Sequence, residues 1–173
     1  QTGMMAMEPR SGHIKAWVGG VNYKYFQYDH VGQGARQVGS TFKPFLYATA
    51  IEQLGMSPCD SIIDSYFTMP KGKWGIDADW SPKNSDGNYR GTITLQKALA
   101  NSVNTVSAKL IDRVGPKAVV DMAKELGVTS DIPEQPSIAL GAVDITVEQM
   151  VGAMSTFANQ GVYVKPTFII KIE

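Results

Sequence analysis

The sequence predicts one domain of the mixed α/β class. Apolar residues alternate at 3–8 and 14–18, on either side of the turn-forming residues 9–12, and this pattern indicates a β-hairpin. Helical periodicity recurs in three later segments, at 40–55, 116–126 and 146–159. Neither a linker nor an internal repeat interrupts the sequence, so we expect a single core.

Each of the three helices carries start or stop signals with a known physical basis. In the first helix, Pro44 falls in the first turn, where its missing N–H costs no hydrogen bond, and Gly55 is a natural stop. The second helix is entered by proline and closed by glycine. At the start of the third, Thr146 and Gln149 have the spacing of a capping box.

The other segments are expected to be irregular or extended. Residues 19–38 are rich in glycine, tyrosine and glutamine and indicate a loop. Residues 56–92 form a longer irregular excursion, and loops of such length are usually functional or mobile. Residues 162–172 alternate into a final strand, in which Pro166 favours an edge position.

Composition limits the functional classes. The chain has 173 residues, 43% of them hydrophobic, and a formal net charge of zero, so neither nucleic acid nor an anionic membrane surface is an expected partner. One cysteine, Cys59, excludes an internal disulfide and a multi-cysteine metal site. His13 and His30 lack metal-ligand spacing, and no metal or other cofactor is expected. No apolar run approaches the roughly 20 residues that span a bilayer.

The most informative feature is a serine and a lysine three positions apart, Ser40 and Lys43, at the head of an apolar helix. A serine hydroxyl is a poor nucleophile unless a base lies within reach, and residues i and i+3 share a helix face. Burial would lower the pKa of this lysine and make its neutral amine accessible. The pair indicates an acyltransferase with lysine as the base, although ordinary solvated helix starts carry the same spacing.

A second polar cluster occupies residues 101–105, between two helical patterns. From the residues alone, two interpretations stay open. Ser102 or Asn104 could cap the helix that follows. Alternatively, both face a cleft, where Ser102 relays a proton and Asn104 holds a substrate amide.

These motifs resemble those of the penicillin-binding proteins and their serine β-lactamase relatives, which carry a Ser-x-x-Lys, a Ser-Asp-Asn type and a Lys-Thr-Gly motif. The resemblance is to the transpeptidase domain of the class A, bifunctional penicillin-binding proteins, and it covers nearly the whole chain. Six stretches are similar to that family in its order, at 36–45, 80–84, 89–91, 98–105, 137–142 and 157–161.

The resemblance implies a β-lactamase/transpeptidase-like fold, an antiparallel sheet flanked by helices. It also implies a peptidoglycan D,D-transpeptidase of cell-wall synthesis, which forms an acyl-enzyme from D-Ala-D-Ala stem peptides and transfers it to an amine on a neighbouring stem. β-Lactams would acylate the same serine. Such a protein would act at the extracytoplasmic face of the bacterial membrane, with its anchor and a glycosyltransferase domain outside this chain.

The same resemblance assigns roles to single residues. Ser40 would be the nucleophile, Lys43 its proton acceptor, and Ser102 the relay toward the leaving group. The backbone N–H of Ser40 would supply one of two oxyanion-hole donors. The expected substrate contacts are Asn104 on the stem-peptide amide, with Trp80 and Asn84. An aromatic residue in the long excursion could also serve in packing alone.

The chain departs from the family pattern in one respect, because it contains no Lys-Thr-Gly or Lys-Ser-Gly. In relatives that motif lies on a later strand, which supplies the second oxyanion donor and a cation for the substrate carboxylate. We therefore expect residues 1–173 to be the N-terminal portion of a transpeptidase domain, incomplete at its C-terminal side. Exposed strand edges would favour self-association, and the missing donor would impair catalysis.

Two other functions stay open. A class A β-lactamase needs a Glu-x-x-Leu-Asn stretch to activate a deacylating water, whereas residues 134–138 read Glu-Gln-Pro-Ser-Ile. A non-catalytic β-lactam sensor, or a structural remnant of the fold, would keep the motifs without turnover. Covalent labelling and turnover with a peptide donor and acceptor would separate these functions.

Overall fold

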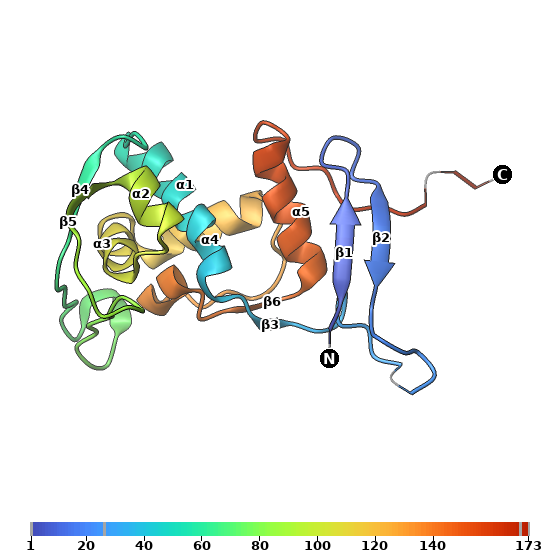
Figure 1. Cartoon of the computed structure of the whole chain (residues 1–173), viewed down its shortest axis with the longest axis horizontal. Coiled ribbons are helices and arrows are strands. Elements are labelled where there is room, and N and C mark those ends of the chain that lie inside the picture. Colours follow the sequence, from blue (N-terminus) through green and yellow to red (C-terminus); the bar gives the residue numbers. More distant parts are fainter. Residues whose placement is uncertain (1, 26, 170, 173) are drawn as a thin grey trace. The chain divides into compact units, whose positions relative to one another are not determined.

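The computed structural model describes residues 2–25, 27–169 and 171–172, and these form a mixed α/β structure, as the sequence predicted. Within them, the strands pair in three antiparallel sheets of two strands each (Figure 1). The chain divides into two compact units. We call them the hairpin unit (Gln1–Gln37, Ala123–Asp131 and Asp144–Glu173) and the helical unit (Val38–Met122 and Ile132–Val143).

The hairpin unit is built on the predicted β-hairpin. Strand β1 (Met4–Met7) pairs antiparallel with β2 (Ile14–Val18), and the register shifts once, between Ala6 and Met7. Helix α5 (Val147–Ala158) packs against β1, as Figure 1 shows beside the hairpin. The prediction of strands at 3–8 and 14–18 is therefore confirmed, as is the helix at 146–159.

The start of α5 differs in part from a capping box. The Thr146 side chain accepts a hydrogen bond from the Gln149 backbone N–H, as the spacing predicted. The Gln149 side chain, however, accepts from the backbone N–H groups of Thr129 and Ser130, at 3.0 and 2.8 Å. It thus ties a neighbouring loop to the helix. A second short pair, β3 (Arg36–Gln37) with β6 (Asp144–Ile145), lies in the same unit and was not predicted.

The predicted strand at 162–172 is wrong. Among its described residues, the pairing is a single parallel bridge between Thr167 and His13. Ile14 N–H donates to the Thr167 carbonyl and Thr167 N–H donates to the Gly12 carbonyl, both at 2.9 Å. Pro166 has no N–H and cannot continue the ladder on its side of the bridge.

The helical unit packs its helices around α1 (Lys43–Leu54), which is preceded by the 3₁₀ helix η1 (Gly39–Phe42). Helix α1 packs against α2 (Leu95–Ala100) and α3 (Asn104–Val114). It ends at Gly55, whose φ of 62° matches the predicted stop. Fully buried apolar side chains fill this core, among them Phe42, Phe45, Leu46, Val106, Leu110 and Ile111.

Two further helical elements are a 3₁₀ helix and a longer α-helix. The 3₁₀ helix η3 (Pro136–Leu140) packs against α3 and η1 within the helical unit. Helix α4 (Pro116–Glu125) confirms the prediction at 116–126, and the boundary between the two units falls inside it. None of the helices in the described part of the chain is long and apolar enough to cross a bilayer.

The long excursion at 56–92 is more ordered than the sequence indicated. Strand β4 (Ser61–Asp64) pairs antiparallel with β5 (Gly91–Thr94), and the short 3₁₀ helix η2 (Lys73–Gly75) lies between them. Backbone hydrogen bonds of 2.9 Å in both directions between Met69 and Trp80 close a smaller loop inside the excursion. The sequence reading missed these strands because Pro, Gly, Asp and Asn recur through residues 56–92 and indicated a loop.

The residue before Ser40 is held by a close backbone approach. Gly39 N–H donates to the Gly141 carbonyl at 3.1 Å, and Val38 N–H donates to the Val143 carbonyl at 3.0 Å. Gly141 has a φ of +76°, and a Cβ atom there would lie 1.8 Å from the Gly39 carbonyl oxygen. A side chain at position 141 would therefore collide with the backbone that leads into Ser40.

We predict that Gly141→Ala destabilises the protein by more than about 3 kcal/mol, because the backbone clash adds to the cost of a positive φ. The measurement is thermal unfolding followed by circular dichroism. Gly87→Ala is the matched control, since Gly87 has a φ of +73° and nothing within 4 Å of its added Cβ. That control should lose only about 1–2 kcal/mol. Equal losses in the two variants would contradict the close approach.

Candidate active site

Ser40 and Lys43 lie where η1 passes into α1. Ser40 is exposed on the 3₁₀ turn, and Lys43 is the first residue of α1, with a side chain only 1% exposed. The backbone N–H of Lys43 donates a hydrogen bond to the backbone carbonyl of Ser40. A 3₁₀ helix has three residues per turn, so Ser40 and Lys43 eclipse one another on one side of the backbone. The predicted common face is present, although the helix opens with a tighter turn than expected.

The Lys43 amine is directed at the segment that follows α2. It donates to the Ser102 carbonyl at 2.7 Å, to Ser102 Oγ at 3.0 Å and to Asn104 Oδ1 at 2.7 Å. These three bonds use all three N–H groups of a lysine ammonium. They bring together the two motifs that the sequence analysis singled out. The expected hydrogen bond from Lys43 to Ser40 Oγ is not among those formed by the described residues.

Burial has the predicted effect on this amine. Removal from solvent lowers the pKa of Lys43 from 10.5 to about 8. At pH 7 roughly a tenth of the molecules would then carry a neutral amine, against far less than a hundredth for a solvated lysine. The neutral form frees a lone pair, so the same nitrogen can accept a proton.

Ser102 adopts a backbone conformation that L residues rarely take, with a φ of 51°. Its N–H donates to the Leu99 carbonyl at 2.9 Å, which closes the turn after α2. The turn presents both the carbonyl and the hydroxyl of Ser102 to Lys43. Strained residues of this kind persist where the surroundings fix them, and here the fixed partner is the buried amine.

The simple capping interpretation of this cluster is wrong. The N-cap residue of α3 is Val103, which makes no side-chain cap bond, and neither Ser102 nor Asn104 takes that role. The cap comes from elsewhere in the chain. Asn84 Oδ1 accepts from the backbone N–H groups of Asn104 and Thr105, at 2.9 and 3.2 Å.

Asn84 also donates both of its N–H groups, to Asp64 Oδ1 at 2.9 Å and to the Asn88 carbonyl at 2.8 Å. Its side-chain amide therefore uses all four hydrogen-bonding positions inside the protein, and the residue is 6% exposed. The geometry leaves no vacant position for the direct substrate contact expected of Asn84. It instead fixes the start of α3, the helix that begins with Asn104.

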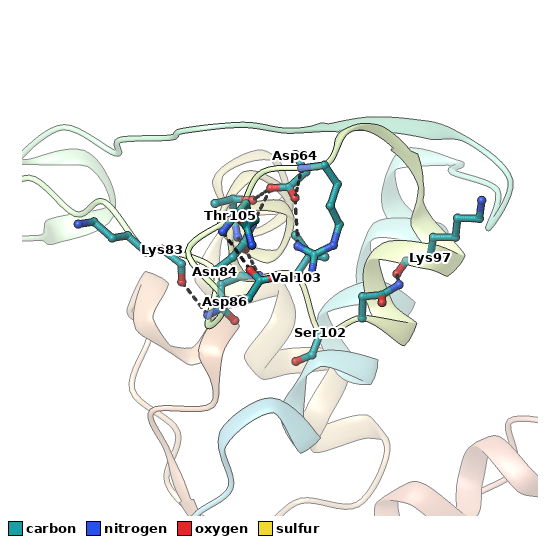
Figure 2. A network of polar contacts seen from close by, with 12 residues as sticks. Asp64, Lys83, Asn84, Asp86, Lys97, Ser102, Val103 and Thr105 are labelled. Atoms are coloured by element: carbon teal, nitrogen blue, oxygen red, sulfur yellow. Dashed lines mark hydrogen bonds and ion pairs between the residues drawn. The ribbon is translucent and has the colours of Figure 1, made fainter.

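Asp64 is the buried centre of this network and was not singled out from the sequence. Its carboxylate accepts from Asn84, from the Thr105 hydroxyl and from the Arg90 backbone N–H (Figure 2). The Asp64 side chain is fully buried. Burial raises the pKa of Asp64, but hydrogen bonds from Thr105, Asn84 and Arg90 outweigh that effect and hold the pKa below its ordinary value. The only sequence signal was an acidic residue directly after Ile62 and Ile63.

The two remaining residues predicted to contact a substrate, Asn104 and Trp80, lie in different surroundings. Asn104 Nδ2 donates to the Lys83 carbonyl at 2.9 Å, so Asn104 bridges the excursion and the buried lysine. Trp80 is half-buried at the bridge with Met69, and the hydrogen bonds of the Lys43 amine go to Ser102 and Asn104 rather than to Trp80. Among the same described residues, no three His, Cys, Asp or Glu side chains gather to hold a metal.

The structure joins the buried Lys43 to Ser102 and Asn104, one turn after the exposed Ser40, and comparison with known proteins gives the family. The chain belongs to the penicillin binding protein transpeptidase domain family, whose model matches residues 2–173. It is 38% identical to penicillin-binding protein 1A of Aquifex aeolicus over 172 residues, 98% of this chain. It is 37% identical to penicillin-binding protein 1A of Neisseria flavescens over 173 residues, 99% of this chain.

Solved structures agree. The chain matches penicillin-binding protein 1A from Haemophilus influenzae with a TM-score of 0.89 at 29% identity, over 95% of this chain and 24% of that one. It matches the PonA1 protein from Mycobacterium tuberculosis in complex with penicillin V with a TM-score of 0.80 at 29% identity, over 95% and 45%. The chain spans about a fifth of the length of the curated relatives, 23% and 21% for the two above.

We predict that Asn84→Ala lowers the free energy of unfolding by about 3 kcal/mol, because it leaves Asp64 short of a donor and α3 without its cap. Urea denaturation measures the loss, and amide hydrogen exchange should quicken at Thr105. Asn88→Ala is the control, since Asn88 enters the network through its backbone carbonyl and N–H. It should stay within about 0.5 kcal/mol of the unmodified chain. Similar losses in both would contradict the role of Asn84.

Proposed function

We propose that this chain carries the first two motifs of a peptidoglycan D,D-transpeptidase, a serine-type acyltransferase of cell-wall synthesis. The proposal rests on one observation above all. Lys43 is a buried amine with a lowered pKa, one turn after the exposed Ser40 and bonded to Ser102 and Asn104. Nucleophilic catalysis by serine requires a base of that kind within reach of the hydroxyl, and the 3₁₀ turn sets Lys43 on the same side of the backbone as Ser40.

In the first half-reaction, Ser40 Oγ attacks the carbonyl carbon of the penultimate D-Ala, and its proton passes to the neutral amine of Lys43. The backbone N–H of Ser40, at the start of the helix, donates to the developing oxyanion. When the peptide bond breaks, the amine of the leaving D-Ala takes the proton from Lys43. Ser102 Oγ relays it, since it lies 3.0 Å from Lys43 Nζ. Lys43 returns to its neutral form and Ser40 carries the acyl group.

In the second half-reaction, an amine on a neighbouring stem attacks the acyl carbon and Ser40 leaves with a proton. The new amide cross-links two glycan strands. A β-lactam enters the same path at its first step, because opening of its ring acylates Ser40, and the acyl-enzyme then hydrolyses slowly. The relative PonA1 has been solved in complex with penicillin V, which supports β-lactam binding as a proposal for this chain.

The neighbouring residues take separate roles in this scheme. Asn104 Nδ2 donates one N–H to the Lys83 carbonyl, and its second N–H is proposed to hold a carbonyl of the stem peptide. Trp80 is proposed to wall the peptide cleft. For Asn84 we infer a positioning role, because its internal bonds fix the N-terminus of α3.

The short share of the relatives' length supports a larger natural polypeptide. We propose that residues 1–173 are the N-terminal portion of its transpeptidase domain, and that it also carries a glycosyltransferase domain and a membrane anchor. Its catalytic domains would face the extracytoplasmic side, where stem peptides and β-lactams meet it. Self-association of residues 1–173 alone stays a prediction.

The test is intact-mass spectrometry after exposure to a penicillin, on this chain and on the natural polypeptide that contains it. We expect one adduct per molecule in the natural polypeptide and none in its Ser40→Ala variant. Ser57→Ala, an exposed serine in the excursion, should keep the adduct. An adduct that survives Ser40→Ala, or a natural polypeptide that is never labelled, would refute the proposal. Rapid loss of the adduct would indicate a hydrolase instead.

A further inference from the structure

The peptide unit between Gly39 and Ser40 has a close neighbour to which the reaction scheme assigns no role. In that scheme the N–H of this peptide, which belongs to Ser40, donates to the developing oxyanion. The carbonyl of the same peptide belongs to Gly39. A trans peptide is planar, so its C=O and its N–H point in opposite directions. Whatever fixes the direction of the Gly39 carbonyl therefore fixes the direction of the Ser40 N–H as well.

Gly39 by itself would leave this peptide free to rotate. Its φ is +56°, and a Cβ atom at position 39 would meet nothing within 4 Å. Glycine has more backbone freedom than any other residue, because no Cβ restricts its dihedral angles. An oxyanion donor has to be oriented before charge develops, so a second element must remove the freedom that Gly39 allows.

Gly141 supplies this restraint, because its backbone lies against the Gly39 peptide. The three heavy atoms nearest to a Cβ placed on Gly141 are the carbonyl oxygen, the carbonyl carbon and the Cα of Gly39. In addition, Gly39 N–H donates to the Gly141 carbonyl at 3.1 Å. The hydrogen bond keeps Gly39 against Gly141, and the close packing then leaves the Gly39 carbonyl little room to rotate.

Gly141 is itself held in place within the helical unit. It directly follows the 3₁₀ helix η3, and its N–H donates to the carbonyl of the fully buried Ile138 at 2.8 Å. Two residues further on, the Val143 carbonyl accepts from the Val38 N–H at 3.0 Å. The segment 141–143 is therefore a fixed support for the backbone that leads into Ser40.

A glycine with a positive φ at the end of a helix has a simpler explanation, since such residues commonly end helices for conformational reasons alone. Gly55 is of that kind: it ends α1 with a φ of +62°, and a Cβ there would meet nothing within 4 Å. Gly141 has a φ of +76°, but its missing Cβ also makes room for the Gly39 peptide. The helix end explains the dihedral angle of Gly141 and leaves the contact with Gly39 unexplained.

We propose that Gly141 is a positioning residue of the acylation step, which directs the Ser40 N–H at the oxyanion by holding the Gly39 carbonyl. The inference rests on the proposed function. In this role Gly141 acts only through the peptide that it packs against and makes no contact with the ligand. The oxyanion forms in the transition state, so the effect of Gly141 belongs to the rate of the chemical step and not to the affinity for the unreacted ligand.

The test follows acylation by a penicillin in the natural polypeptide that contains residues 1–173, by rapid quenching and intact-mass spectrometry. It separates the rate constant at saturating penicillin, the concentration that gives half of that rate, and the fraction of molecules labelled. Gly141→Ala should lower the rate constant by about tenfold or more and leave the half-saturating concentration unchanged. A loss of folded molecules alone would lower only the labelled fraction.

A second variant adds no bulk and should fold even where Gly141→Ala does not. An ester in place of the amide between Val38 and Gly39 removes the N–H that donates to Gly141, and it keeps the Gly39 carbonyl and the Ser40 N–H. Because one hydrogen bond is lost, the rate constant should fall by about fivefold. Gly55→Ala is the matched control, since it replaces a helix-ending glycine of positive φ and should leave the rate constant unchanged.

If the unmodified polypeptide is never acylated, the proposed function is wrong and the inference falls with it. If acylation is normal, but Gly141→Ala and the ester change only the labelled fraction, Gly141 merely ends a helix; the inference is then overturned and the function stands. If Gly141→Ala yields no labelled molecules, the rate constant of the ester decides alone. Equal slowing in Gly55→Ala, or a raised half-saturating concentration at an unchanged rate constant, would also overturn the inference.

Discussion

The burial of one lysine amine is the constraint on which the rest of the site depends. Lys43 is almost fully removed from solvent at the first residue of α1, where an unpaired charge would be costly. Its cost is offset by three acceptors from Ser102 and Asn104, which fix the break between α2 and α3 against α1. The compensation is incomplete, so the pKa falls to about 8 and the amine can act as a base.

A network of polar residues around the buried Asp64 holds these acceptors in place. Asn84 caps α3 and binds the buried Asp64, which in turn accepts from Thr105 and Arg90. A fully partnered polar network of this kind fixes one arrangement, because any alternative leaves a buried group unpaired. The position of Asn104 therefore depends on residues of the excursion 56–92. Arg90 joins the buried Asp64 to the exposed Asp86.

Local features of this chain were predictable from sequence, and long-range ones were not. The hairpin, the three helices and the stop at Gly55 follow from periodicity and from proline and glycine chemistry. The lowered pKa of Lys43 followed from its place in an apolar helix. The hydrogen bonds from Lys43 to Ser102 could not be predicted from periodicity, because the partners are 59 residues apart and only folding sets their distance. The cap from Asn84 was missed because an amide 20 residues away carries no local signal. The expected final strand is wrong, because among its described residues a single bridge at Thr167, directly after Pro166, takes the place of a ladder.

The most direct measurement is an NMR titration of the Lys43 amine in protein labelled with ¹³C at lysine Cε, with Lys43→Arg to assign the resonance. We expect a midpoint at a pKa of about 8, against the ordinary 10.5. Since the folded state then binds fewer protons than the unfolded chain between those values, the free energy of unfolding should rise with pH across that range. A midpoint above about 10 would show a solvated amine and contradict the central claim.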